Sequence, residues 1–188
     1  FLWDGQIETD LYVLFDGEQP LVDNYNAGQD FDYLDAVLRT GSQQSHNISA
    51  RGGTEKTAYN ASIGYFKEEG IVPGMDYERI NARLNLDHRI NDMFKFGMST
   101  TLTQATNNWG SNAVMNEALR NLPIGSPYLD DGVTPRFNTW NDGIATNPLA
   151  EIVPGAYIDE RLSTRIFLPT YLQITFNPDL RFTTTFGP

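Results

Sequence analysis

The residues best suited to bind a ligand are aromatic and amide side chains within residues 105–158, where regular alternation is absent. Aromatic faces stack on sugar rings and amides bond to hydroxyl groups, and apolar walls with a few polar groups are typical of a ligand cavity. We therefore predict a substrate-binding role for Asn107, Trp109, Tyr128, Asn138 and Trp140. Three further residues of the same types lie in this region, namely Asn108, Asn141 and Tyr157. The alternative is that these aromatics pack the region on itself, plug a lumen or contact a partner protein.

Residues that could carry out catalysis are few. His46 and His88 lie in expected strands, and no local pattern supplies the nucleophile, base and orienting group of a catalytic triad, so we interpret both as structural. Asp130 and Asp131 could in principle act in glycoside hydrolysis, but adjacent acids ahead of a glycine are typical of a turn. The chain has no cysteine and no phosphate- or dinucleotide-binding glycine pattern. The sequence predicts no catalytic residue, no metal site, no cofactor and no enzymatic activity.

The net charge of −11 argues against nucleic acid as a partner, because phosphate binding needs clustered Lys and Arg. The charge is unevenly distributed, since residues 1–44 hold nine acidic side chains and a single basic one, Arg39. We interpret this stretch as a solvated acidic surface. A divalent-cation site is the alternative, although no Asp-x-Asp-x-Asp-Gly loop supports it.

The elements that position these side chains are strands, because residue types alternate with a period of two. Ile80, Ala82, Leu84 and Leu86 share one face of residues 79–88, and polar residues fill the other face. Residues 57–67 and 93–104 repeat the pattern, with aromatics at strand ends. Alternating strands of about ten residues are typical of a transmembrane β-barrel, whereas strands of soluble sandwiches are usually nearer five or six residues.

The predicted order of elements begins with residues 1–44, an irregular segment with a short helix at 31–40. Asp30 or Asp32 would cap this helix, and Gly41 would end it. Residues 45–104 form four antiparallel strands (45–51, 57–67, 77–89 and 93–104), the first two joined by a tight turn at 52–56 whose glycines adopt positive φ. Residues 105–158 form a long loop with a short helix at 112–120. Residues 159–188 form two further strands, 160–176 and 181–186, with a bulge or a non-bonded edge position at Pro169.

Short turns and long loops alternate along this order, as in outer-membrane barrels, whose short turns face the periplasm. We therefore expect residues 1–44 and 105–158 to be extracellular. About six strands cannot close a barrel, and an open edge in lipid leaves backbone groups unsatisfied. We accordingly expect the chain to be part of a larger barrel.

The run from His46 to Phe66, His-Asn-Ile-Ser-Ala-Arg-Gly-Gly-Thr-Glu-Lys-Thr-Ala-Tyr-Asn-Ala-Ser-Ile-Gly-Tyr-Phe, resembles the first barrel strands of SusC/RagA-type TonB-dependent transporters. So does its continuation, through Glu69-Gly70-Ile71, Tyr77-Glu78-Arg79 and Arg83-Leu84-Asn85-Leu86-Asp87. Phe-Asp-Tyr-Leu-Asp at 31–35, Asp-Gly at 131–132 and Asn-Pro-Leu-Ala at 147–150 also match family patterns. The resemblance covers residues 30–188.

The resemblance implies an all-β, antiparallel transmembrane barrel of about 22 strands in the outer membrane of a Gram-negative bacterium. It further implies an N-terminal plug, a SusD-like surface lipoprotein as partner, and coupling to the TonB complex through parts not in this chain. The implied activity is import of oligosaccharides, or of peptides in the RagA-like branch. A soluble all-β binding or adhesion module is the alternative, and it would surround the following side chains with protein instead of lipid: Ile80, Leu84, Leu86, Phe94 and Phe96.

Overall fold

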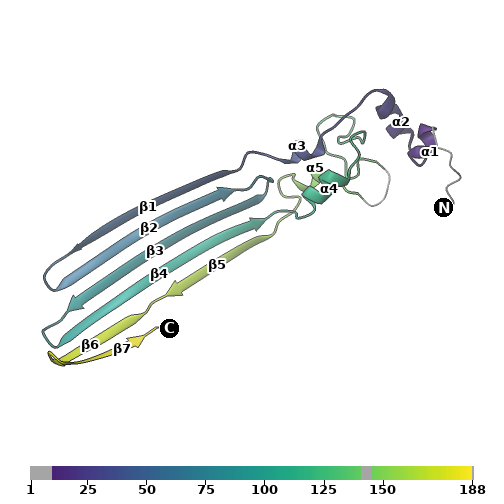
Figure 1. Cartoon of the computed structure of the whole chain (residues 1–188). Helices are drawn as coiled ribbons and strands as arrows, with labels where there is room; N and C mark the ends of the chain where they lie inside the picture. Colours follow the sequence, from purple (N-terminus) through teal and green to yellow (C-terminus); the bar gives the residue numbers. More distant parts are fainter. Residues whose placement is uncertain (1–9, 141–144, 188) are drawn as a thin grey trace, which may run out of the picture. The chain divides into compact units, whose positions relative to one another are not determined.

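The structure is a computed structural model that describes residues 10–140 and 145–187. The chain divides into two compact units (Figure 1). The loop unit comprises Phe1–Thr40, Ile71–Met75 and Trp109–Asp159, and the strand unit comprises Gly41–Gly70, Asp76–Asn108 and Glu160–Pro188. Both units are therefore assembled from segments that are far apart in the sequence.

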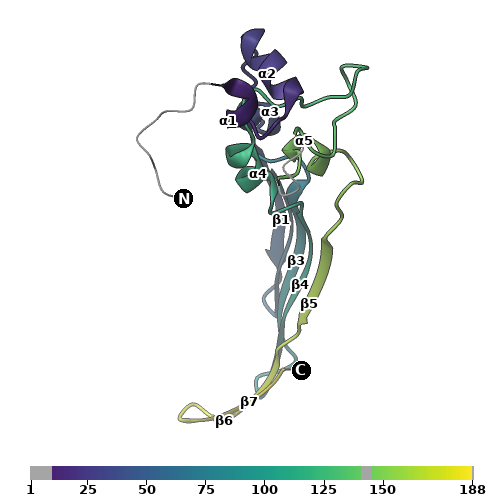
Figure 2. The same cartoon turned by 90° about the vertical axis from the view of Figure 1, so that its right-hand side faces the viewer.

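The strand unit is built on one antiparallel sheet of seven strands, as the alternation predicted. Its order is β1-β2-β3-β4-β6-β7, and β5 pairs with β4 alongside β6. Seen edge-on in Figure 2, the sheet is a single layer, and its β6–β7 hairpin bends away from the long strands. The strands are β1 (Ser42–Gly53), β2 (Thr57–Glu69), β3 (Met75–Arg89), β4 (Phe94–Trp109), β5 (Glu160–Phe167), β6 (Thr170–Asn177) and β7 (Leu180–Phe186). The first four strands are longer than predicted, and β4 extends into the region expected to be loop.

The strand predicted for residues 160–176 is divided at Pro169, which is why the sheet has seven strands where six were expected. The two parts share one register on β4, with Phe167 opposite Thr101 and Thr170 opposite Met98. No residue is inserted between them, so of the two predicted alternatives at Pro169, a bulge or a non-bonded position, the structure excludes the bulge. The proline carbonyl accepts a hydrogen bond from Ser99 N at 2.9 Å, and the proline has no N–H with which to return it. The ladder therefore loses one bond without changing register.

The turn between β1 and β2 lies where it was expected, but its glycines do not adopt positive φ. Gly52 and Gly53 are the last two residues of β1. A Cβ on Gly53 would lie 2.3 Å from the Thr57 carbonyl oxygen, and a Cβ on Gly52 would lie 2.6 Å from the Tyr59 hydroxyl. Close approach of neighbouring atoms is therefore the reason for both glycines.

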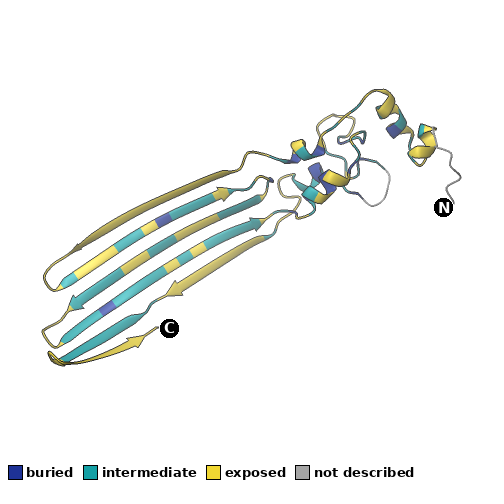
Figure 3. Ribbon diagram, in the orientation of Figure 1, coloured by how far each residue is buried: buried dark blue, intermediate teal, exposed yellow. Residues whose placement is uncertain are grey.

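The two faces of the sheet differ in chemistry, which confirms the predicted alternation. We call one the polar face; across three strands it carries the registered set Arg51, Asn60 and Asn85. We call the other the apolar face; it carries Ile48 opposite Ile63 in the same register. Figure 3 shows that almost all strand residues are exposed or half-buried. The large apolar side chains exposed on the apolar face include Ile48, Tyr59, Ile63, Ile80, Leu84, Leu102, Leu162, Ile166, Phe182 and Phe186.

The described residues of the loop unit contain more helix than the sequence suggested, in five short segments: α1 (Leu11–Leu14), α2 (Gln19–Asn26), α3 (Tyr33–Val37), α4 (Val114–Arg120) and α5 (Pro148–Glu151). The Asp32 carboxylate caps α3 by accepting a hydrogen bond from Asp35 N at 2.9 Å. The chain leaves this helix at Leu38, so the predicted end at Gly41 was wrong. The helices α1, α2 and α5 were not predicted, because segments of four to eight residues give little helical periodicity.

A small core holds the loop unit together. Tyr33 and Val37 of α3 pack against Val72, from the β2–β3 connection, and against residues of the β4–β5 connection, Val114, Ala118 and Leu149. Residues 110–140 and 145–159 are therefore folded, with their own helices, and do not form a structureless loop. Within the described residues, helices are all too short or too polar to cross a bilayer.

Candidate functional site

Buried amides give the loop unit its shape. The Asn147 side chain is fully buried; its amide group donates to the carbonyl oxygens of Pro127 at 2.7 Å and Arg136 at 2.8 Å. Its own oxygen accepts from Leu149 N at 3.0 Å and so caps α5. One side chain thus joins three parts of the segment, because an amide carries both donors and an acceptor.

A second buried amide, Asn121, extends this network. It donates to the carbonyl oxygens of Glu117 and Thr146, each at 2.8 Å, and its own oxygen accepts from the Thr139 hydroxyl. The buried Glu117 carboxylate accepts from Thr146 N at 3.0 Å and lies 3.3 Å from the Arg120 guanidinium. Polar side chains therefore supply hydrogen bonds to backbone N–H and C=O groups that would otherwise be paired within strands or long helices.

Asn138 and Trp140, two of the predicted binding residues, line one pocket of about 310 Å³ in the loop unit. The other charged and hydroxyl residues that line this pocket are Glu18, Ser126, Arg136 and Thr139. An indole beside a guanidinium, a carboxylate and an amide can hold a small polar ligand of about one ring. The binding role of Asn138 and Trp140 stays a prediction.

The other predicted binding residues lie elsewhere. Tyr128 packs on the core, with its ring centroid 6.1 Å from that of Phe31, and its carbonyl accepts from Arg136 Nε at 2.6 Å. Asn107 lies inside β4 opposite Arg161, and Trp109 is the last residue of β4 with half of its surface exposed. The prediction that they sit in a loop was therefore wrong for Asn107, Asn108 and Trp109. Tyr157 is half-exposed, and Asn141 lies outside the described residues.

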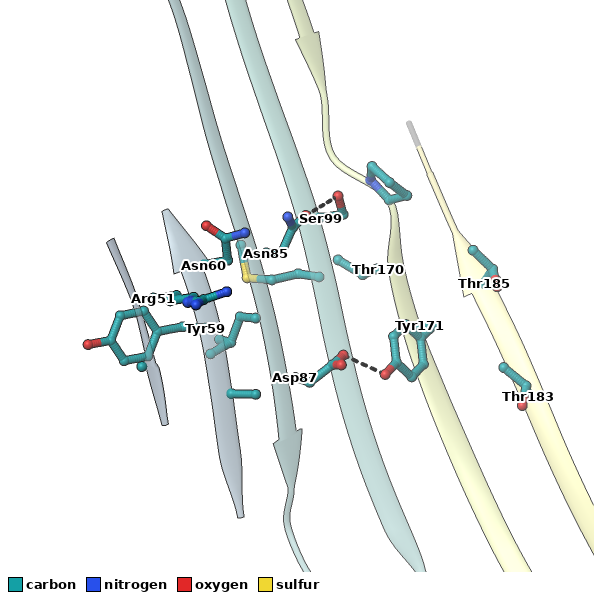
Figure 4. Close-up of a pocket in the computed structure, with 15 residues that line it drawn as sticks. Arg51, Tyr59, Asn60, Asn85, Asp87, Ser99, Thr170, Tyr171, Thr183 and Thr185 are labelled. Atoms are coloured by element: carbon teal, nitrogen blue, oxygen red, sulfur yellow. Dashed lines mark hydrogen bonds between the residues drawn. The ribbon is translucent and has the colours of Figure 1, made fainter. Parts of the chain in front are cut away.

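The polar face of the strand unit has a larger hollow, of about 920 Å³, which Figure 4 shows. Within it the Tyr171 hydroxyl donates to Asp87 Oδ1 at 2.6 Å. Lys95 Nζ lies 3.4 Å from Asp87 Oδ2 and 5.6 Å from the centre of the Tyr171 ring. One row further along, the Ser99 hydroxyl donates to Asn85 Oδ1 at 2.6 Å. These contacts join β3, β4 and β6 across the polar face.

Gly97 makes this arrangement possible. A Cβ at this position would lie 2.1 Å from Tyr171 Cε1 and 2.6 Å from Asp87 Oδ1, so the tyrosine ring lies directly over the glycine. Sequence reasoning did not single out Gly97, Asp87 or Tyr171. The signal was a glycine inside a strand, which often marks close approach of another group.

Hydrogen bonds, burial and one ion pair account for the state of three ionisable side chains in the loop unit. Burial raises the pKa of Tyr33 to about 12. The Thr134 hydroxyl and the backbone N–H groups of Val133 and Thr134 donate to Asp131 and lower the pKa of its carboxyl group. Asp130 pairs with Arg136 at 3.1 Å, so both adjacent acids serve the turn around Gly132. In the described part of the chain, no cluster of three or more His, Asp or Glu side chains is placed to hold a metal ion.

No protein-family model matches the chain. TonB-dependent receptor P3 of Formosa agariphila is 31% identical over 180 residues, which cover 90% of this chain and 18% of the receptor. TonB-dependent receptor SusC of Bacteroides thetaiotaomicron is 28% identical over 102 residues, or 53% of this chain and 10% of the receptor.

The chain is a relative of the SusC-type TonB-dependent receptors. It spans less than a fifth of the length of these curated relatives. Solved structures support the same fold: the RagAB peptide transporter matches 98% of the chain and 23% of its own, with a TM-score of 0.68 and 22% identity. The RagAB peptide importer in its "open-open" state gives a TM-score of 0.65 at 23% identity. The sheet of this SusC-type chain therefore has the form of a barrel segment.

Proposed function

We propose that this chain is part of a TonB-dependent outer-membrane importer of oligosaccharides that works with a SusD-like surface lipoprotein. The observation that carries the proposal is the exposed apolar face of the long strands, on a chain related to SusC. A large, continuous apolar surface marks a contact with lipid or with protein. Strands of 12 to 16 residues in β1 to β4 are long enough to cross a bilayer at the usual tilt.

Aromatic residues at both ends of the apolar face support the membrane setting. Tyr59, Phe94 and Phe182 lie on it near the short turns, and Tyr65 lies on it near the far end of β2. Tyr59 and Tyr65 are six residues apart, or roughly 20 Å along an extended strand. Transmembrane barrels place aromatic girdles on either side of an apolar band about 25 Å tall. We infer that the apolar face contacts lipid and the polar face lines the barrel interior.

A soluble all-β module fits these observations less well. Five side chains distinguish lipid from a sandwich core. Ile80 and Leu84 are exposed to 46% and 39%, and the other three, Leu86, Phe94 and Phe96, are half-buried. The strands of the described residues belong to one sheet, whereas a sandwich core needs two inner faces that interdigitate. The names of the relatives are those of receptors and transporters, which favours a non-enzymatic role.

The cargo class rests on fewer observations. The relationship to SusC and the pocket that contains Trp140 and Asn138 favour an oligosaccharide, since an aromatic face and an amide suit a sugar ring. The fold likeness to the RagAB peptide transporter favours peptides as the second candidate.

Extraction of the complete protein from native membranes tests the proposal. We expect it to require detergent and to bring a surface lipoprotein with it. Deletion of its gene should abolish growth on a particular oligosaccharide and leave growth on peptides intact. Recovery of the protein in the aqueous fraction would refute the barrel assignment. Growth loss on peptides alone would transfer the assignment to the RagA-like alternative.

A further inference from the structure

The charges of this acidic chain are segregated. The strand unit holds ten Lys and Arg against nine Asp and Glu, although the whole chain has a net charge of −11. Within the paired strands, Glu68 and Asp87 are the carboxylates of the described residues on the polar face. Among the residues paired in the strand registers, the same face carries six arginines: Arg51, Arg79, Arg83, Arg161, Arg165 and Arg181. The polar face is therefore cationic on a chain that is anionic as a whole.

Two of these arginines line a single groove of about 510 Å³ over β1, β2 and β3. Arg51 is registered with Asn60 and Asn85, and the next row holds Arg83 with Ser62 and Ser49. Asn47, one row further, is the remaining lining residue. We call this the arginine–amide groove.

The two guanidinium groups are exposed and unpaired. Lys67, Lys95, Arg120 and Arg136 each lie within salt-bridge distance of a carboxylate. In the part of the chain that the structure describes, neither Arg51 nor Arg83 has an ion-pair or hydrogen-bond partner for its side chain. No carboxylate lines the groove. Within the described residues, both positive charges are therefore left without a counter-charge.

The spacing of the groups defines the ligand. Arg51 and Arg83 lie two strands and one row apart, so their Cα atoms are roughly 12 Å apart on ordinary sheet spacings. A guanidinium forms paired hydrogen bonds with a carboxylate or a sulfate-like anion. The asparagine and serine side chains between the two arginines offer donors and acceptors for hydroxyl groups.

We propose that the arginine–amide groove binds an anionic oligosaccharide, one that carries carboxylate or sulfate groups on separate sugar units. This inference rests on the proposed function and adds the charge of the cargo to it. An oligosaccharide fits better than an acidic peptide because the groove has no aromatic or aliphatic side chain to receive apolar peptide side chains. The six arginines make the polar face positively charged, and a negatively charged ligand complements that charge.

The test is calorimetric titration of the complete transporter, in detergent and with its lipoprotein, using a panel of uronate-bearing and sulfated oligosaccharides. Neutral oligosaccharides of the same lengths form the comparison panel. We expect an anionic member to bind, and Arg51→Gln and Arg83→Gln each to weaken that binding by about tenfold or more while neutral binding stays unchanged. Arg165→Gln is the matched control, because it removes one unpaired positive charge from the same face outside the groove.

The outcomes separate this inference from the proposed function. Binding of neutral oligosaccharides alone would overturn the anionic groove and leave oligosaccharide import standing. Binding of acidic peptides alone would overturn both. If Arg51→Gln and Arg83→Gln lower the melting temperature without any selective loss of anionic ligand, the guanidiniums hold another part of the protein, and the groove is not a cargo site. If Arg165→Gln weakened anionic binding equally, the effect would come from the overall positive charge of the polar face, and the groove would not be the binding site.

Discussion

Gly97→Ala is expected to destabilise the sheet where β3, β4 and β6 meet. The new methyl group would lie 2.1 Å from Tyr171 Cε1 and 2.6 Å from Asp87 Oδ1, well inside van der Waals contact. The ring must therefore leave Gly97, and the 2.6 Å hydrogen bond from its hydroxyl to Asp87 is lost.

The magnitude follows from two terms. Overpacking of a well-filled site costs about 1–3 kcal/mol. Loss of a hydrogen bond to a charged acceptor costs about 1.5–3 kcal/mol, and solvent at this half-buried position reduces that figure. We expect a total near 3 kcal/mol, which corresponds to about a hundredfold change in a local opening equilibrium.

Amide hydrogen exchange of residues 94–101 in the complete protein, followed by mass spectrometry, measures that opening. Gly64→Ala is the matched control, because the three atoms nearest to its new methyl group all belong to the Asn81 side chain, the nearest at 2.7 Å. An asparagine side chain can rotate away, so the control should change exchange by less than about tenfold.

A double-mutant cycle decides the cause. In a Tyr171→Ala background the space above Gly97 is empty on the tyrosine side, and Gly97→Ala should then cost little. A full cost in that background would show that the ring is not responsible. Unchanged exchange in the single Gly97→Ala variant would refute the argument altogether.

Three further predictions concern other parts of the molecule. Asn147→Ala should destabilise the loop unit by roughly 3 kcal/mol, because two carbonyls and the Leu149 N–H lose their hydrogen-bond partner. Limited proteolysis of residues 110–159 measures this loss of stability. Resistance to cleavage equal to that of the wild type would contradict the prediction. Ile63→Arg should impair membrane assembly by roughly 2–4 kcal/mol if the apolar face meets lipid, as measured by folding into vesicles, while Ile63→Leu should fold normally. The pKa of Tyr33 is raised from 10.0 to about 12, so the stability that its neutral form contributes is present below pH 10 and is lost as the pH rises towards 12. Melting temperatures measured over a pH series should show this alkaline loss in the wild type and not in Tyr33→Phe.

Much of the strand unit could be predicted from the residues alone. Alternation along 57–67, 79–88 and 93–104 identified the strands and assigned each side chain to a face, because a pleated backbone turns successive residues to opposite sides. The paired registers of β1, β2 and β3 preserve those faces. Strand ends were predicted less accurately: β4 continues to Trp109 through Asn107 and Asn108, whose residue types suggested a loop.

The loop unit was predicted least well. Its helices are short, and its core comes from three separated segments that meet at Tyr33 and Val72. The role of Asn147 depends on carbonyls of Pro127 and Arg136, 20 and 11 residues away. Local sequence patterns do not reveal such distant contacts. Tyr128, which was predicted to bind a ligand, packs on Phe31 for the same reason.

The sequence by itself determined which residues of each strand share a face and that one face is apolar, since this depends only on local backbone geometry. Tertiary structure decided which residues lie opposite one another. It placed Tyr171 over Gly97 and Arg51 one row from Arg83, and it kept one register through Pro169. The physical reason is that register is set by hydrogen bonds and side-chain contacts between strands far apart in sequence, whereas the period of a strand belongs to the strand alone.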